Sequence, residues 1–183
     1  MIARLLHSFF GGVHPPENKN CSTTAPIARK NDFFADPLIL PLKQGTGSAG
    51  VPCVQVGQLV LKYQPLTRVT DHFSTPIHAP TSGQIIAIGP HIVPHPSGLP
   101  QECLFLKPDQ KDTPYAYPRL DFERADAQTI GTYLQQAGIV GLGGAVFSTH
   151  IKARPKHEHN TVILNGAECE PWITCDDQLM QAQ

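Results

Sequence analysis

Two short segments near the C-terminal end of the chain combine residue types that could bind a cofactor. The first ends at Lys152 and contains three glycines within four residues, Gly141, Gly143 and Gly144. Without Cβ atoms, these positions let the backbone approach a flat or anionic ligand closely. Ser148 is placed to cap a short helix that holds Lys152, and free amides at a helix start favour phosphate. The segment therefore predicts a site for an anionic ligand that carries a ring.

The second segment is polar and follows an expected apolar strand, Thr161 to Leu164. It carries one amide side chain, Asn165, and two carboxylates, Glu168 and Glu170. Amide and carboxylate groups supply the hydrogen bonds that orient a ring ligand in a site. This loop therefore offers the polar edge that such a ligand requires.

Two common nucleotide motifs do not fit the glycine-rich segment. A Rossmann fingerprint needs G-x-G-x-x-G between a strand and a helix, but Val146 stands where the third glycine belongs. An expected helix, and not a strand, also precedes the run. The G-x-x-x-x-G-K-[ST] sequence of a Walker A loop is absent. Both motifs are therefore excluded.

The two segments resemble those of the C subunit of the Rnf/Rsx electron-transport complex and, more distantly, the NADH-oxidising subunit of respiratory complex I. The pattern of the Rnf/Rsx family reads G-L-G-G-A-x-F-P-T-x-x-K and then N-x-A-E-C-E-P-[YW]-I-T-x-D-D-x-L-M. This chain follows the second part almost without a break from Asn165 to Met180, and residues 11–19 resemble the opening of the family. It departs at Ser148, where proline is usual, and at Val146, where glycine is common.

The resemblance implies a flavin-dependent subunit that exchanges a hydride with NAD(H) and passes single electrons to iron–sulfur clusters. The cofactor-binding residues that it implies are Gly141, Gly143, Gly144, Lys152, Asn165, Glu168 and Glu170. The glycines would form a backbone bed for FMN, and the lysine would pair with a flavin oxygen or phosphate. The asparagine would bind the isoalloxazine edge, while the two glutamates would line the nicotinamide side and bind ribose hydroxyls. No catalytic residue is assigned.

The same resemblance places the protein in a membrane complex that couples ferredoxin and nicotinamide pools to ion transport. The implied partners are the other subunits of that complex, NADH and, indirectly, ferredoxin. The implied location is peripheral, on the cytoplasmic face of the bacterial inner membrane. The family's two four-cysteine motifs for 4Fe-4S clusters are absent here, so both clusters and the rest of the α/β domain are expected downstream of Gln183.

Composition excludes several classes of protein. The chain has 183 residues, 40% of them apolar, which is enough for one packed domain or two small ones. Its 14 basic and 15 acidic side chains give a formal net charge of −1, so no basic excess favours nucleic acid. No apolar run approaches the ~20 residues that cross a bilayer, and residues 1–10 are too short for a signal peptide.

The thiol and imidazole groups predict neither a disulfide framework nor a metal site. The five cysteines are scattered and include no C-x-x-C pair, so reduced cysteines are expected. His157 and His159 lie two positions apart, which points them to opposite sides of an extended loop, and no third ligand is fixed.

The chain is expected to contain three parts and to have an α+β fold. Residues 1–36 form an extended arm, residues 37–118 a β module, and residues 119–183 the beginning of an α/β flavin- and NADH-binding domain. The β module resembles a barrel-sandwich hybrid of the biotinyl/lipoyl type, with its halves at residues 52–61 and 77–88. Gly57 and Gly83 are expected in tight turns, and Tyr63 occupies a turn position where this fold often uses glycine.

The link between the halves, residues 67–75, contains no acceptor lysine, so covalent biotin or lipoate is not expected. Apolar residues at three- and four-residue steps from Phe122 to Ala137 predict a helix that ends at Gly138. Thr174 and Asp177 predict a capping box for a later helix. An alternative to the flavin enzyme is a noncatalytic docking or assembly module whose glycine loop is empty.

Overall fold

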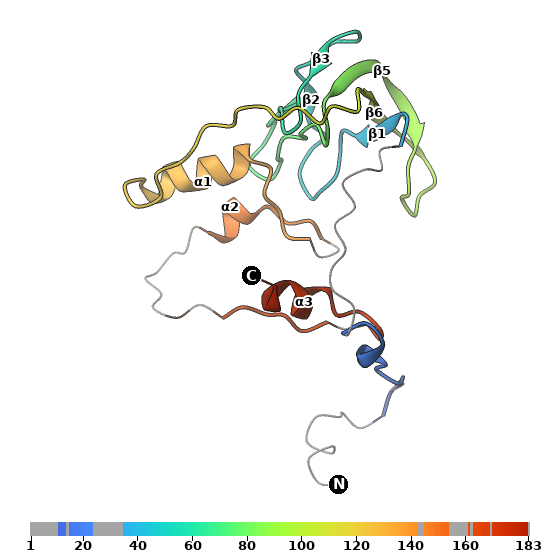
Figure 1. The fold of residues 1–183 in the computed structure, drawn as a ribbon, viewed down its shortest axis with the longest axis vertical. Coiled ribbons are helices and arrows are strands. Elements are labelled where there is room, and N and C mark those ends of the chain that lie inside the picture. Colours follow the sequence, from blue (N-terminus) through green and yellow to red (C-terminus); the bar gives the residue numbers. More distant parts are fainter. Residues whose placement is uncertain are drawn as a thin grey trace. The chain divides into compact units, whose positions relative to one another are not determined.

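The computed structural model describes residues 11–13, 15–23, 35–142, 145–153, 161, 163–168 and 170–182. The chain divides into two compact units, one from residues 1–31 with 159–183 and the other from residues 32–158 (Figure 1). These units cut across the three predicted parts, because the N-terminal residues group with the C-terminal segment. The three-part division remains a prediction.

The larger unit begins with a β module. Its strands are β1 (Leu38–Pro41), β2 (Val51–Pro52), β3 (Leu59–Val60), β4 (Thr67–Arg68), β5 (Gly83–Ile92) and β6 (Pro100–Pro108). They form a four-stranded sheet in the order β1-β6-β5-β3 and a two-stranded sheet of β2 with β4. All of these pairs are antiparallel. Short strands divided between two sheets agree with the β architecture predicted from residue 37 onward.

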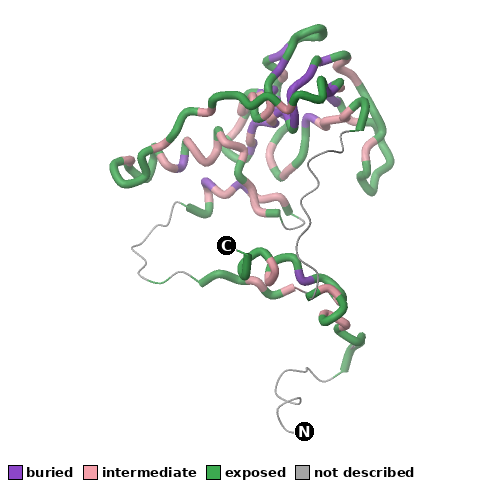
Figure 2. The backbone as a smooth tube through the Cα atoms, viewed as in Figure 1, coloured by how far each residue is buried: buried purple, intermediate pink, exposed green. Residues whose placement is uncertain are grey.

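The core of this unit lies between the curled sheet and the loops that cross it, where Figure 2 shows the buried positions gathered. Side chains alternate along the first part of β5, so that Ile85 is fully buried while its neighbours Gln84 and Ile86 are exposed. The buried residues of the cluster are Leu42, Val54, Val60, Leu66, Ala79, Ile85, Leu104 and Leu106. This apolar core makes the β module a rigid base for the segments that follow it.

The residues predicted to lie in turns do not all do so. Gly57 has φ +90° and Tyr63 has φ +68°, so both adopt the left-handed conformation expected of glycine-type turns. The turn prediction for Gly83 is wrong, because this residue pairs with Pro108 within the β5–β6 ladder. A Cβ there would lie 2.1 Å from the carbonyl oxygen of Lys107. Close approach of two strands therefore requires this glycine.

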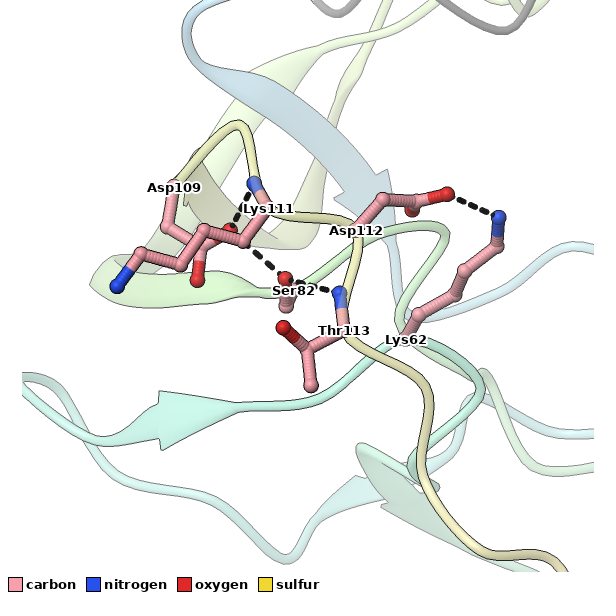
Figure 3. A network of polar contacts seen from close by, with 6 residues as sticks. All are labelled: Lys62, Ser82, Asp109, Lys111, Asp112 and Thr113. Carbon is pink, nitrogen blue, oxygen red and sulfur yellow. Dashed lines mark hydrogen bonds and ion pairs between the residues drawn. The ribbon is translucent and has the colours of Figure 1, made fainter.

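A polar network directs the chain away from β6 (Figure 3). The Ser82 hydroxyl donates to Asp109 Oδ1 at 2.7 Å and accepts the Thr113 N–H at 2.8 Å. The Lys62 ammonium pairs with Asp112, which holds the pKa of that carboxyl below its usual value. The Lys62 N–H also donates to the Thr113 carbonyl at 2.9 Å. These bonds fix the start of the segment that leads to the first α-helix.

Helix α1 (Ala127–Gln136) begins later than the sequence predicted. Phe122 and Ala125 lie outside it, because the Asp126 carboxylate accepts the Thr129 N–H at 2.6 Å and caps the helix at that point. The predicted end is confirmed, since Gly138 follows with φ +69°. Helix α2 (Thr149–Lys152) is one turn long.

The smaller unit contains a short 3-10 helix, η2 (Lys19–Cys21), and helix α3 (Cys175–Gln181). The predicted strand over residues 161–164 is wrong, because its described residues form no strand and Ile163 and Leu164 are 87% and 79% exposed. A strand needs a partner for its backbone groups, and the described part of this unit supplies none. Across the described residues, no helix combines the length and apolar character needed to span a membrane.

Candidate cofactor site: a glycine loop and an acidic loop

The glycine loop, residues 140–152, is closed by backbone bonds within the larger unit. Val140 and Ser148 form an antiparallel bridge, and the Gly141 N–H donates to the Phe147 carbonyl at 2.8 Å. Two of the predicted site residues, Gly143 and Gly144, lie outside the described residues. The described part therefore shows the base of the loop, where the chain enters and leaves it.

Lys152 lies directly over this base. A Cβ on Gly141 would stand 3.2 Å from Lys152 Nζ, so the absence of a side chain makes room for the ammonium group. The same nitrogen lies 5.8 Å from the centre of the Phe147 ring. Lys152 is exposed, and no described carboxylate forms an ion pair with it. The structure thus brings Gly141 and Lys152 together and leaves a cation available for an anionic group.

The predicted helix cap at Ser148 is only partly correct. Ser148 occupies the N-cap position of α2, but its hydroxyl is bonded to His150 Nδ1 at 2.5 Å, and both residues are buried. The Thr149 N–H donates to the Ile139 carbonyl at 3.1 Å, so it does not face a ligand. Of the two groups predicted to face an anion, the structure therefore exposes the Lys152 ammonium group and not the Thr149 N–H. His150 was not among the site residues predicted from the sequence.

The tip of the β module, residues 70–75, contacts the glycine loop. His72 and His150 meet edge to face with ring centres 5.1 Å apart, and Phe73 and Phe147 do so at 6.4 Å. Gln135 of α1 holds the other side of the tip, because its Nε2 lies 3.1–3.4 Å from the carbonyl oxygens of residues 71, 72 and 74. The tip thus packs between helix α1 and the glycine loop.

Hydrogen bonds within the tip fix its shape. The Asp71 carboxylate accepts the N–H groups of Ser48, Phe73 and Ser74 at 2.9, 2.8 and 2.7 Å. These bonds, with Ser48 the largest cause, lower the pKa of Asp71 from 3.8 to about 2. The buried Ser74 hydroxyl accepts the Thr70 and Asp71 N–H groups at 2.8 and 2.9 Å. The tip is therefore a closed, internally bonded turn.

The acidic loop, residues 165–173, lies in the smaller unit and holds the remaining predicted residues. Asn165 is exposed, and its Oδ1 accepts the Ala167 N–H at 2.9 Å, which closes a local turn. Glu170 is also exposed, and no described donor reaches its carboxylate. Both side chains therefore retain groups that face solvent and can meet a ligand.

Glu168 has a different environment from Glu170. Its Oε1 accepts the Asp176 N–H at 3.0 Å and the Cys175 thiol at 3.1 Å. The Asp176 amide is the largest cause that lowers the pKa of Glu168, so the carboxylate is ionised at neutral pH. Glu168 therefore caps the start of α3.

The predicted capping box at this helix is wrong. Thr174 occupies the N-cap position, but its hydroxyl donates to Ser22 Oγ at 3.1 Å. Asp177 accepts from the Gln181 side chain at 2.9 Å and does not reach back to the cap. Capping-box reasoning compares residues three apart, so it could not detect a carboxylate that comes from upstream of the helix.

Glu168, Cys175 and Asp176 bring three potential metal-binding atoms within 4.8 Å of one another. The hydrogen bond to Glu168 raises the pKa of the Cys175 thiol, and a protonated thiol is a poor metal ligand. The hydrogen bonds from Cys175 and Asp176 to Glu168 explain why these three residues lie close together. The cluster gives no support for a metal centre.

Comparisons with known proteins match two domains in this chain. Residues 7–111 match the RnfC barrel sandwich hybrid domain, and residues 134–183 match the Nuo51 FMN-binding domain. The C subunit of the ion-translocating oxidoreductase complex of Vibrio cholerae serotype O1 is 48% identical over 178 residues, which is 96% of this chain and 23% of that protein. The proteins of the same name from Serratia proteamaculans and Edwardsiella ictaluri are 47% and 45% identical over 94% and 96% of this chain.

The fold and the two matched domains define the class of protein, in which a barrel-sandwich hybrid precedes an FMN-binding domain of complex I type. The α+β prediction and the barrel-sandwich prediction are thereby confirmed. The chain belongs to the RnfC family, the C subunits of ion-translocating oxidoreductase complexes. It spans about a quarter of the length of the curated relatives that it matches, 22% to 24% for the three proteins compared above.

Proposed function

We propose that this chain forms part of the flavin- and NADH-binding region of an electron-transport subunit. In the complete protein, electrons would pass between NAD(H) and 4Fe-4S clusters, and through them to the ferredoxin pool. The subunit would act at the cytoplasmic face of the bacterial inner membrane, docked on the other subunits of an ion-translocating complex. The names of the relatives and the match to an FMN-binding domain support this proposal.

The observation that carries the proposal is the ammonium group of Lys152 over the backbone of Gly141, within the segment that matches an FMN-binding domain. FMN, when bound, supplies the change between two-electron hydride transfer and single-electron transfer. Lys152 would neutralise its phosphate or a flavin oxygen, because an exposed ammonium group that has no described ion pair and lies beside a glycine backbone suits an anion. Gly141, Gly143 and Gly144 would form the bed on which the ligand lies.

The acidic loop would serve the nicotinamide nucleotide and the flavin edge. Asn165 would hydrogen-bond the isoalloxazine edge, and Glu170 would bind ribose hydroxyls through its exposed carboxylate. The capping bonds of Glu168 favour a division of roles, in which Glu168 orders the start of α3 and uses only its second oxygen toward a ligand. Neither glutamate is expected to transfer a proton, since hydride exchange with a flavin needs no side-chain base in this scheme.

Flavin content and affinity test the proposal. A full-length protein that contains this segment should be yellow and should release FMN on denaturation. Lys152→Ala should weaken FMN binding by about tenfold or more, because a charge-assisted contact contributes roughly 1.5–3 kcal/mol. The matched control is Lys43→Ala, which removes an exposed lysine that has no hydrogen bond or ion pair in the described structure. Fluorescence titration measures both affinities.

Two other results would redirect the proposal. Equal FMN affinity of Lys152→Ala and the parent would remove Lys152 from the site. A colourless full-length protein that still assembles with its partners would favour the docking or assembly alternative. Gly141→Ala tests the same contact without removing the lysine. Its Cβ would displace the flexible end of Lys152 and meet no backbone atom closer than 3.6 Å. It should weaken FMN binding and leave thermal stability unchanged.

A further inference from the structure

Among the lysines that the structure describes, Lys19 stands apart in how its ammonium group is bound. Its Nζ lies 3.0 Å from the carbonyl oxygen of Glu168, 3.2 Å from that of Glu170 and 2.9 Å from that of Ile173. An ammonium group has three N–H donors, and here each donor has its own acceptor. All three acceptors belong to the acidic loop, about 150 positions later in the chain.

The three carbonyl groups converge on one point, where their negative ends would repel one another without a cation. Lys19 therefore takes the place that a bound metal ion takes in other carbonyl-lined loops. Neighbouring residues align the two segments. The Trp172 N–H donates to the Glu17 carbonyl at 2.9 Å, and the Ser22 hydroxyl lies within hydrogen-bond distance of the carbonyls of Lys19 and Trp172.

The backbone of the acidic loop needs such support. Trp172 has φ +74°, a left-handed conformation that is unfavourable for a large side chain. Such a conformation persists only where surrounding contacts impose it. The carbonyls of Glu170 and Ile173 flank this residue, and both are held by Lys19. Lys19 holds the backbone carbonyl of Glu170 and leaves the carboxylate of that residue exposed. The lysine therefore sets the position from which the Glu170 side chain extends.

We propose that Lys19 is a positioning residue for the nicotinamide side of the cofactor site, which it serves by fixing the backbone of the acidic loop. The inference rests on the proposed function, because it assigns to this loop a nucleotide that carries ribose hydroxyls. The N-terminal segment would thereby contribute to ligand binding, although it lies about 150 positions before the acidic loop. In the described part of the chain, the hydrogen bonds of the Lys19 ammonium group go to backbone oxygens, so Lys19 does not act on the ligand directly.

The first test measures loop order without any ligand. Lys19→Met keeps the length of the side chain and removes its three donors. Amide hydrogen exchange over residues 165–173 of the chain should become about tenfold faster, as expected when the bonds that hold a loop closed are lost. Lys43→Met is the matched control and should leave this exchange unchanged. Exchange at the parental rate in Lys19→Met would overturn the proposal.

The second test measures nucleotide binding in a full-length protein that contains this segment. Lys19→Met should raise the KM for NADH by about tenfold and leave FMN content at the parental level. Lys19→Arg should recover only part of the affinity, because a planar guanidinium cannot point three donors at three converging carbonyls. A faster-exchanging loop with an unchanged KM would show that the order of this loop does not matter for the nucleotide, and would overturn the proposal.

The two tests separate this inference from the proposed function. A full-length parent protein that neither holds FMN nor oxidises NADH would refute the proposed function and, with it, the nucleotide assigned to the loop. The exchange experiment would still report whether Lys19 orders the acidic loop.

Discussion

The glycine loop and the acidic loop are supported in different ways. The glycine loop rests on the tip of the β module through two ring–ring contacts, and Gln135 of α1 holds that tip from the other side. The acidic loop has no sheet beneath it in the described structure, and Lys19 gathers three of its carbonyls. Ring–ring packing thus supports one loop, while hydrogen bonds support the other, three of them from the Lys19 ammonium group.

The tip of the β module shows a carrier-type fold used without a prosthetic group. In carrier domains the tip between the two halves presents a lysine that bears a prosthetic group. Here the corresponding residues, 67–75, contain no lysine, and the carboxylate of Asp71 binds three backbone amides of its own neighbourhood. The position that would carry a mobile group instead forms a fixed surface for the glycine loop.

The largest expected effect concerns the β module, on which the glycine loop rests. Gly83→Ala should destabilise the larger unit by about 3 kcal/mol, because its Cβ would lie 2.1 Å from a backbone oxygen that cannot move freely. Gly89→Ala is the matched control in the same strand, since a Cβ there meets no atom within 4 Å. Denaturant unfolding measures both variants.

Hydrogen exchange on the Gly83→Ala variant tests whether the two loops are supported independently of each other. Exchange should quicken in the glycine loop and stay unchanged in the acidic loop, whose supports come from other residues. Equal stability of the Gly83→Ala and Gly89→Ala variants would contradict the close strand contact. Faster exchange in both loops would contradict the separation of their supports.

A smaller, pH-dependent effect is expected at the tip. The folded-state pKa of Asp71 is lowered from 3.8 to about 2, so its carboxylate stabilises the fold above pH 3.8. This contribution is lost as the pH falls from 3.8 toward 2. Asp71→Asn should therefore lower the melting temperature at pH 7, and the gap to the parent should narrow in that acidic range.

The control for this measurement is Glu123→Gln, which neutralises an exposed carboxylate with no hydrogen bond in the described structure. It should follow the parent at every pH. A gap between the Asp71→Asn variant and the parent that stays constant from pH 7 to pH 2 would mean that the charge of Asp71 is unimportant for the tip.

Features set by a residue and its immediate neighbours could be predicted from the sequence. The turns at Gly57 and Tyr63 and the helix end at Gly138 were predicted correctly, because backbone preference is a local property. The turn predicted at Gly83 was wrong, because contact with a distant strand requires that glycine. The start of α1 was a missed local signal, since Asp126 is a standard N-cap residue ahead of its helix. The family could also be predicted from the sequence, because each of its two motifs is a continuous segment.

Pairings between distant segments could not be predicted in this way. Nothing in the neighbourhood of Lys19 indicates that its ammonium meets carbonyls about 150 positions later, and nothing around Gln135 indicates the tip that it holds. The expected strand over residues 161–164 failed for the same reason, since pairing partners decide whether an apolar run forms a strand. The assignment of the seven cofactor residues remains a prediction.

The smallest expected effects distinguish the two glutamates of the acidic loop. Glu168→Gln should lower the melting temperature and quicken exchange in α3, because a neutral amide is a weaker acceptor for the Asp176 N–H at the helix start. The same hydrogen bond is the largest cause that lowers the pKa of Glu168 below 4.5. The difference in melting temperature between the variant and the parent should therefore shrink as the pH falls below 4.5. The KM for NADH should rise less in this variant than in Glu170→Gln, because the capping bonds occupy Oε1 and leave only the second oxygen for a ligand.

Glu170→Gln should have the opposite pattern. Its carboxylate is exposed and holds no helix, so the melting temperature should match the parent. If it binds a ribose hydroxyl, the KM for NADH should rise by about fivefold while FMN content is retained, as expected when one ground-state hydrogen bond is weakened. Steady-state NADH oxidation with an artificial acceptor, measured beside a melting curve, separates the two variants. A lower melting temperature with unchanged kinetics would give Glu170 a structural role like that of Glu168 and would leave the nicotinamide ribose without a carboxylate partner in this loop.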